Sequence, residues 1–330
     1  MTWATWRQYR IELIIALAVI GWLTAFIIPA GASLVTRFED SGLAACLRSD
    51  GLSGCGTLAQ RFIDSYRDFS TVTMWLEFLP SAAGVLAAAP IIMEIEQRTY
   101  RMAWTQSVTR GRWIATKLAL ALVGIAVFSA AYAAMKGWFY SPLLRVDEPF
   151  NRTFGATSVV PFAYAIFCFG VALAAGVLSR RTIPAMLVMV ILYFVARVFV
   201  GDVLRPAFTA PLEVRQPMFT GEMLSPRPEV IPERSWIVSI SMVDKSGQIV
   251  EQAEIDQIDA TCGRMEKGMT EKEISAAFLA CLGDREYTQR FTYHPPDRLV
   301  KFQAMESGIY VGAAAALLAL VVGLVVRRAR

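Results

Sequence analysis

Six apolar runs divide this chain of 330 residues, and each is long enough to cross a lipid bilayer. An α-helix rises about 1.5 Å per residue, so about 20 apolar residues cover the roughly 30 Å of hydrocarbon in a membrane. Because backbone polar groups inside a bilayer must be satisfied within the segment, such runs favour helices. We predict an all-α polytopic membrane protein whose six transmembrane helices cover residues 11–28, 73–93, 114–135, 159–178, 184–200 and 307–326.

The composition supports this class and argues against several others. Hydrophobic residues make up 55% of the chain and charged residues 18%, whereas soluble domains have about 45–50% and about 25%. The net charge of +4 is spread beside the apolar runs, which argues for orientation in a bilayer and against nucleic-acid binding. The chain has one histidine and no P-loop, HExxH or Gly-x-Ser-x-Gly motif, so we expect no catalytic, cofactor or metal site.

Basic residues indicate which segments face the cytoplasm, because short basic loops stay inside. They occur at the N-terminus, in residues 94–117, at 180–181 and at the C-terminus, which predicts a plasma-membrane protein with both termini cytoplasmic. Residues 1–10 combine arginines with tryptophans and a tyrosine, as is typical of an interfacial helix.

The remaining boundaries follow from prolines and polar stretches. Pro29 is expected to end the first span, and residues 32–70, whose charges are mixed, form an outer loop. Pro80 and Pro90 fall inside the second predicted span and would kink it. The first five spans and their loops thus occupy residues 11–201.

Residues 202–303 predict a small α+β extracytoplasmic domain between spans five and six. Residues 236–243 alternate in part and precede the turn sequence Asp-Lys-Ser-Gly, which predicts a β-hairpin. Thr270 and Glu273 have the spacing of a capping box that opens a short helix. Residues 304–330 then supply the sixth span and a basic cytoplasmic tail.

Four of the five cysteines form two close pairs in the predicted outer regions. If those regions face an oxidising exterior, Cys46 can bridge Cys55 and Cys262 can bridge Cys281. The alternative is that all four remain free thiols.

Charged residues within the spans are candidate functional groups. Arg197 either faces a cavity and contacts a substrate or a carboxylate such as Glu77 or Asp202, or extends to the outer headgroups. Glu77 and Glu306 lie near span ends and are interpreted as boundary residues.

The cytoplasmic segment 94–117 carries the most specific pattern in the chain. It runs Glu-x-Glu-Gln-x-Thr-x-Arg-x-x-Trp-Thr-Gln-Ser-Val-Thr-Arg-x-Arg-Trp-x-x-x-Lys. This motif resembles the permease subunits of type-2 ABC exporters, especially those of the actinobacterial type, and stretches at 1–10 and 293–310 are similar to that family as well. The chain departs from the family at Arg98, where glycine is usual.

The resemblance implies a six-span half-transporter with the topology of G-subfamily exporters. Such a subunit forms a homodimer or heterodimer and is driven by separate ATPase subunits, so this chain would not itself be an enzyme. Carried over by position, the ATPase-coupling residues would be Glu94, Glu96, Thr99, Arg101, Gln106, Thr109, Arg110 and Arg112.

The sequence is compatible with two functions. The first is an exporter permease that moves an amphiphilic molecule outward. The second is a non-transporting membrane sensor or scaffold whose outer domain, residues 202–303, binds a ligand.

Overall fold

The computed structural model divides the chain into two compact units, a helical unit of Met1–Phe208 and Leu299–Arg330 and a smaller unit of Thr209–Arg298. The structure describes residues 2–49, 51–100, 109–150, 153–155, 158–220, 223–224, 227–262, 270–282 and 287–327.

Within its described residues, the helical unit contains five helices that are long and apolar enough to cross a membrane. They are α5 (Leu79–Glu96), α7 (Arg110–Phe139), α8 (Val160–Ser179), α9 (Thr182–Val198) with its extension, and α12 (Leu299–Arg327). The extension consists of the π-helix η2 (Phe199–Leu204) and the 3₁₀ helix η3 (Arg205–Ala207). These helices match the second to sixth predicted spans, and they establish a multi-pass membrane protein.

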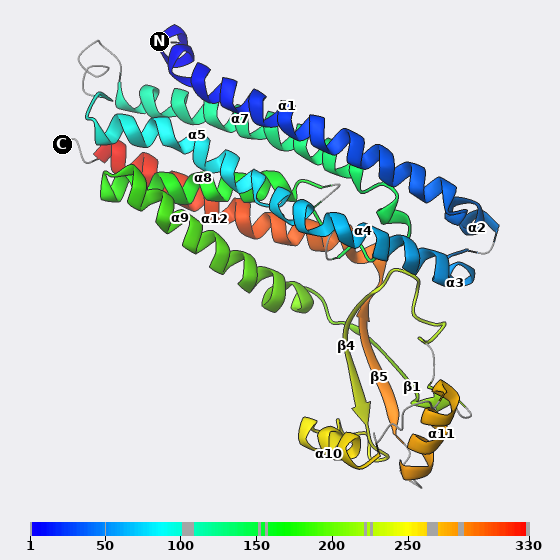
Figure 1. Ribbon diagram of the computed structural model, residues 1–330. Helices are drawn as coiled ribbons and strands as arrows, with labels where there is room; N and C mark the ends of the chain where they lie inside the picture. Colours follow the sequence, from blue (N-terminus) through cyan, green and yellow to red (C-terminus); the bar gives the residue numbers. More distant parts are fainter. Residues whose placement is uncertain are drawn as a thin grey trace. The chain divides into compact units, whose positions relative to one another are not determined.

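The first predicted span lies in α1 (Thr2–Asp40), which is longer than predicted. Residues 1–10 were predicted as a separate interfacial helix, but from Thr2 they are continuous with the span. The expectation that Pro29 ends the span was wrong as well, because the helix continues through this proline to Asp40. Both chain ends lie at one end of the helical unit, which we call the termini end (Figure 1).

Residues 32–70 do not form the predicted polar loop. After α1 they fold into α2 (Leu43–Ser49), α3 (Gly51–Gly54) and most of α4 (Gly56–Leu76), at what we call the cap end of the unit. A turn separates α4 from α5, so Pro80 lies in the first turn of α5 and not inside a span. In the first turn of a helix a missing backbone N–H costs nothing. Pro90 does lie inside a helix.

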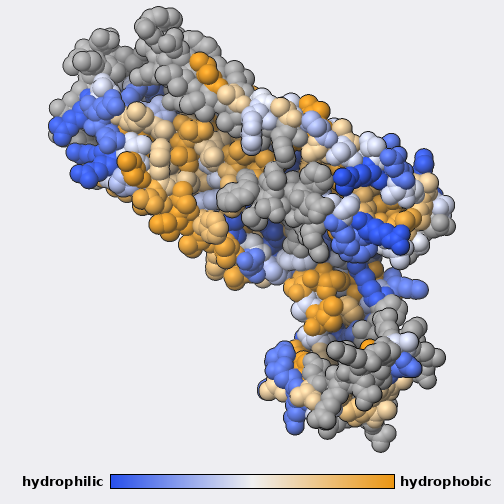
Figure 2. Space-filling view, viewed as in Figure 1, coloured by the Kyte–Doolittle hydropathy of each residue, from blue (hydrophilic) through white to orange (hydrophobic). Residues whose placement is uncertain are grey.

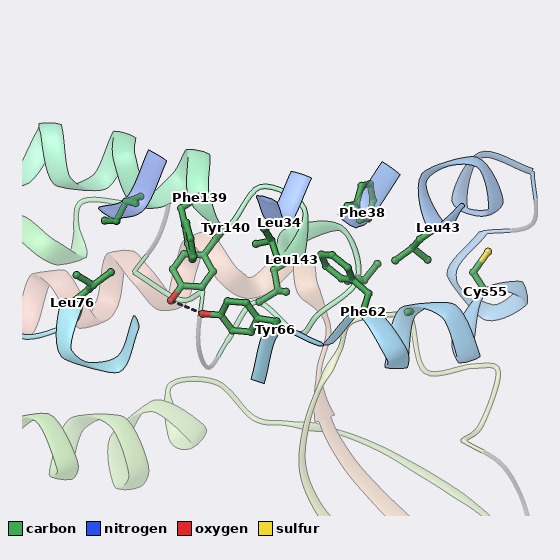
Figure 3. Packing of buried hydrophobic residues seen from close by; sticks show 13 residues of the cluster. Leu34, Phe38, Leu43, Cys55, Phe62, Tyr66, Leu76, Phe139, Tyr140 and Leu143 are labelled. Carbon is green, nitrogen blue, oxygen red and sulfur yellow. Dashed lines mark hydrogen bonds between the residues drawn. The ribbon is translucent and has the colours of Figure 1, made fainter. Parts of the chain in front are cut away.

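The cap end is ordered by its own hydrophobic cluster, shown in Figure 3. Leu34 and Phe38 of α1 meet Phe62 and Tyr66 of α4, and Tyr66 donates a 3.1 Å hydrogen bond to the hydroxyl of Tyr140. The short 3₁₀ helix η1 (Leu143–Arg145) closes the cluster. The predicted Cys46–Cys55 disulfide is present and joins α2 to the turn after α3.

Helix α8 lies at the centre of the membrane helices, and most of its side chains are buried. Helix α5 approaches it closely at Gly84, where any β-carbon would overlap the carbonyl oxygen of Ala165. Helix α9, by contrast, exposes a long apolar surface, which Figure 2 shows in orange. Exposed apolar side chains of α9 include Ile183, Leu187, Ile191, Phe194 and Val195.

The smaller unit is an α+β structure, as predicted, although its bounds are narrower than 202–303. Its main sheet has the order β1-β5-β4 and is antiparallel, and a second sheet pairs β2 with β3. The strands are β1 (Leu212–Pro217), β2 (Phe219–Thr220), β3 (Met223–Leu224), β4 (Trp236–Val243) and β5 (Thr288–His294). The predicted hairpin after β4 is reduced to one bridge between Val243 and Ile249, and β4 pairs along its length with the distant β5.

Two helices, α10 (Gln252–Cys262) and α11 (Glu271–Leu282), complete this unit, and the 3₁₀ helix η4 (Pro296–Arg298) ends it. The predicted Cys262–Cys281 disulfide links the two helices. The capping box is also confirmed, since the Thr270 amide donates to Glu273 Oε2 at 2.7 Å and the Glu273 amide donates to Thr270 Oγ1 at 3.4 Å. The hydrogen bonds that Thr270 donates hold the pKa of the Glu273 carboxyl below its ordinary value.

Candidate functional site

The cap end of the membrane helices is organised around Glu306 of α12, whose side chain has no exposed surface. Arg205 of η3 binds this carboxylate in a bidentate manner. Its Nε donates to Oε2 at 2.8 Å and its Nη2 donates to Oε1 at 3.0 Å. The Tyr164 hydroxyl of α8 donates a further hydrogen bond to Oε1. A buried carboxylate is tolerated where cations and donors satisfy it, and Glu306 meets this condition.

From Glu306 the ionic contacts continue to two other helices. Arg197 Nη1 of α9 lies 3.4 Å from Glu306 Oε1, and Arg197 Nη2 lies 4.0 Å from Glu77 Oε2. Lys136 Nζ of α7 lies 3.3 Å from Glu77 Oε1. We call these five residues, Glu77, Lys136, Arg197, Arg205 and Glu306, the cap-end network.

The cap-end network connects α7, α9 with its extension, α12 and the turn before α5, and the hydrogen bond from Tyr164 adds α8. It contains three cations and two carboxylates, and aromatic rings supply further contacts to the cations. Arg205 lies 3.9 Å from the ring centroid of Phe154, and Arg197 lies 4.9 Å from that of Tyr164. Such contacts stabilise cations that are withdrawn from water. The arrangement contains no activated nucleophile, and its ion pairs hold the helix ends together.

A small hollow beside the network is lined by Tyr132, Arg197 and their neighbours. Its volume is about 20 Å³, which is room for roughly one water molecule. Among the described residues, this hollow at the network is too small to hold a substrate.

These contacts revise the sequence interpretation. Arg197 does reach Glu77, one of the carboxylates considered for it, and its side chain is 28% exposed. The interpretation of Glu306 as a boundary residue was wrong, because the side chain is fully buried between two arginines. Sequence reasoning missed Lys136 and Arg205. Both flank an apolar run, but their partners lie 59 and 101 residues away in the chain.

At the termini end, two carboxylates of α5 make contacts with neighbouring helices. Glu94 Oε1 lies 2.6 Å from Lys117 Nζ of α7, and these side chains are only 12% and 5% exposed. Glu96 Oε2 accepts a hydrogen bond from the backbone amide of Thr182 at 2.9 Å and another from the Thr182 hydroxyl. Since Thr182 begins α9 and the preceding Arg181 makes no side-chain cap, Glu96 caps that helix from another helix.

Other expected coupling residues lie on the surface near these contacts. The Thr109 side chain caps α7 by accepting from the Arg112 amide at 3.4 Å. Thr99 and Arg112 are exposed, and Arg110 is partly exposed. Arg101 and Gln106 lie outside the described residues. Thus the structure brings Glu94, Glu96, Thr99, Thr109, Arg110 and Arg112 to one end of the helical unit.

Arg98 has a left-handed backbone conformation. Its φ of 58° lies in the left-handed region, which glycine adopts without cost and other residues adopt at about 1–2 kcal/mol. Arg98 therefore has a backbone conformation that favours glycine, and its side chain adds a positive charge.

An apolar cavity of about 430 Å³ lies between α1 and α7. Its lining residues are Thr24, Ile28, Phe128, Ala131, Tyr132, Met135 and Trp138. This volume lies within the range of about 300–1,000 Å³ that is typical of small-molecule sites. With few polar groups in the wall, the cavity suits an apolar group.

Comparison with known proteins gives one result. A family model described as "ABC-2 membrane transporter related" matches residues 16–205, which is more than half of the chain and includes segment 94–117. No curated protein and no solved structure matches the chain.

Proposed function

Because the chain belongs to the ABC-2 membrane transporter related family, we propose that it is the permease subunit of an ABC exporter. In this proposal separate ATPase subunits dock on residues 94–117 and drive an amphiphilic substrate across the plasma membrane. The observation that carries the proposal is the family match, which runs through the whole α5–α7 connection.

We further propose six spans, with residues 11–28 of α1 as the first and both termini cytoplasmic. The position of both chain ends at one end of the helical unit supports an even number of crossings (Figure 1). Arg98, Arg110, Arg112 and Arg180, all at the termini end, support its cytoplasmic placement. The permease acts as a homodimer or heterodimer.

The residues of segment 94–117 divide into two groups in this mechanism. The exposed side chains of Thr99 and Arg112, together with Arg110, Arg101 and Gln106, contact the ATPase. Glu94 and Glu96 transmit the movement, because they connect α5 to α7 and to α9. A helix-terminal segment that docks in a groove of the ATPase can convert its closure into rigid-body movement of the attached helices.

An amphiphilic substrate is supported by the cavity between α1 and α7. Its wall would accept the apolar part of such a molecule, while its position among membrane helices allows entry from the bilayer. A carrier of small ions would instead need polar ligands along its path.

The test is site-directed cross-linking in native membranes. The free cysteine of the described chain, Cys168, is buried, so Arg112→Cys introduces a new surface thiol. We expect it to cross-link to a P-loop ATPase identified by mass spectrometry, with a yield that changes when ATP is added. The control is Lys301→Cys, an exposed position at the cap end of α12.

Failure would have a definite meaning. Equal cross-linking from both positions would refute docking at segment 94–117. Absence of any co-purifying ATPase would favour the sensor or scaffold, whose ligand-binding part would be the smaller unit.

A further inference from the structure

The three-stranded sheet of the smaller unit has one apolar and one polar face. Residues in register across antiparallel strands lie on the same face, and faces alternate along each strand. Val214, Phe291 and Ile240 are in register on the apolar face. The neighbouring row, Arg215, Arg290 and Ser241, lies on the polar face. Three side chains with hydrogen-bond donors therefore stand side by side across three strands.

The two arginines of this row face each other without adequate neutralisation. Like charges directly opposite on neighbouring strands are destabilising, so Arg215 and Arg290 are an unfavourable pair in isolation. The nearest carboxylate contact, from Glu213 Oε1 to Arg290 Nη1, is 3.9 Å long, and the Glu213 side chain is 49% exposed. Arg215 forms no ion pair with any residue that the structure describes.

Arg290 also has an unused donor. Its Nε atom is buried and has no hydrogen-bond partner within the described part of the chain. Its side chain is 21% exposed, so other atoms of the guanidinium remain within reach of solvent. A buried donor without a partner is unfavourable, and a bound acceptor would remove this cost.

The turn after β4 borders the row but does not neutralise it. The turn passes close to Arg215, because a β-carbon on Gly247 would lie 3.5 Å from Arg215 Nη1. Its only carboxylate, Asp244, accepts hydrogen bonds within the turn from the Ser246 hydroxyl at 2.7 Å and the Gln248 amide at 2.9 Å. Asp244 is thus held by its own turn, and the positive charge beside it is left for another anion.

We propose that Arg215, Arg290 and Ser241 bind a phosphate group on the polar face of this sheet. A guanidinium presents paired N–H donors that match phosphate or carboxylate oxygens. A carboxylate has two oxygens, whereas a tetrahedral phosphate can reach both arginines and the serine hydroxyl together. Binding would screen the repulsion between the arginines and supply an acceptor for Arg290. The inference is independent of the permease function, since the site lies entirely within Thr209–Arg298.

The phosphate can belong to a free anion or to a lipid headgroup, and the experiment separates these sources. The full chain is reconstituted in phosphatidylcholine nanodiscs, and amide hydrogen exchange is followed in β1 and β5. One arm adds inorganic phosphate, with acetate at equal ionic strength as the carboxylate comparison. The other arm replaces a fraction of the phosphatidylcholine by phosphatidic acid.

We expect phosphate, and not acetate, to slow exchange in β1 and β5. Arg215→Gln should weaken this effect about tenfold, the scale of losing one charge-assisted hydrogen bond. Arg215→Lys should retain part of it, and Lys301→Gln, which removes an exposed charge from α12, should retain all of it. Because Arg215 is exposed, its replacement tests the site even if Arg290→Gln fails to fold.

The outcomes are decisive in each arm. Protection by inorganic phosphate assigns a free phosphate group, and protection by phosphatidic acid alone assigns a headgroup. Equal protection by acetate would overturn the phosphate assignment. Unchanged protection in Arg215→Gln, or none in either arm, would overturn the site.

Discussion

The two ends of the helical unit are both fastened by charged side chains, but they differ in burial. At the cap end, Glu306 has no exposed surface and contacts two arginines and a tyrosine. At the termini end, Glu94 pairs with one cation among the described residues, Lys117, and Glu96 caps α9 at the surface. In a low-dielectric environment, a buried charge that loses its partner is far more costly than an exposed one. The cap end should therefore act as the fixed end of the bundle, and the termini end as the adjustable one.

The strongest test of this contrast is Glu306→Gln. It leaves Arg205 without its carboxylate, and breaking a buried ion pair in this way costs about 3–5 kcal/mol. We expect a loss of this size in the apparent free energy of unfolding, measured by denaturant titration in mild detergent.

The control is Asp202→Asn, which removes an exposed carboxylate of η2 and should change stability by less than about 0.5 kcal/mol. Combining Glu306→Met with Arg205→Met should recover much of the loss, because Arg205 is then not left as a lone charge and Arg197 keeps its contact with Glu77. A small effect of Glu306→Gln alone would contradict the fixed-end interpretation.

A smaller effect is expected from Lys117→Met at the termini end. Glu94 then lacks this cation while its side chain remains 12% exposed, so water can relieve part of the cost. We expect a loss of about 2 kcal/mol in the same titration. Arg112→Gln on the same helix, at an exposed position, serves as the control and should be near neutral. If Lys117→Met equals Glu306→Gln in cost, the two ends do not differ.

Glu96→Ala tests the most exposed of these interhelical contacts, the hydrogen bonds that Glu96 accepts from Thr182. Loss of a helix N-cap costs about 1 kcal/mol, and here the capped helix is α9. Hydrogen exchange should therefore quicken in the first turn of α9 and not in α5. Gln97→Ala, at the next exposed position, should leave that turn unchanged. Faster exchange throughout α9 would mean that Glu96 holds the whole helix and not only its first turn.

The sequence predicts features that depend on residues close together in the chain, and it does not predict features that depend on distant residues. Apolar runs predicted α5, α7, α8, α9 and α12 because burial in a bilayer depends on each segment alone. Short cysteine spacings predicted both disulfides, and the local capping box predicted the start of α11.

Residues 32–70 were predicted as a loop although a signal for helix was present. Leu34 and Phe38, and likewise Phe62 and Tyr66, have the four-residue spacing of one helix face, and all four are buried in the cap cluster. Mixed charge predicts an outer loop, whereas here it marks the solvent side of amphipathic helices.

The cap-end network could not be predicted because its members are distant in sequence. Glu306 meets Tyr164 across 142 residues and Arg197 across 109. Charge alone shows that such residues need partners, but only packing selects them. The hairpin predicted after β4 forms only one bridge, and the main partner of β4 is the distant β5, which lies 45 residues away even at the nearest pair, Val243 and Thr288.

The smallest expected effect concerns backbone strain at the termini end. Arg98 follows α5 and Arg180 follows α8, with φ of 58° and 54°. The left-handed conformation costs an L-residue about 1–2 kcal/mol, while a cation at a helix C-terminus returns about 0.3–1 kcal/mol. Arg98→Gly should therefore stabilise the chain by no more than about 1 kcal/mol in the unfolding titration.

The neighbouring Gln97 has φ of −79°, so Gln97→Gly should instead destabilise by about 0.5–1 kcal/mol. Opposite signs at adjacent positions would show that strain is stored at the adjustable end, and equal losses would show that Arg98 is held there by its side chain.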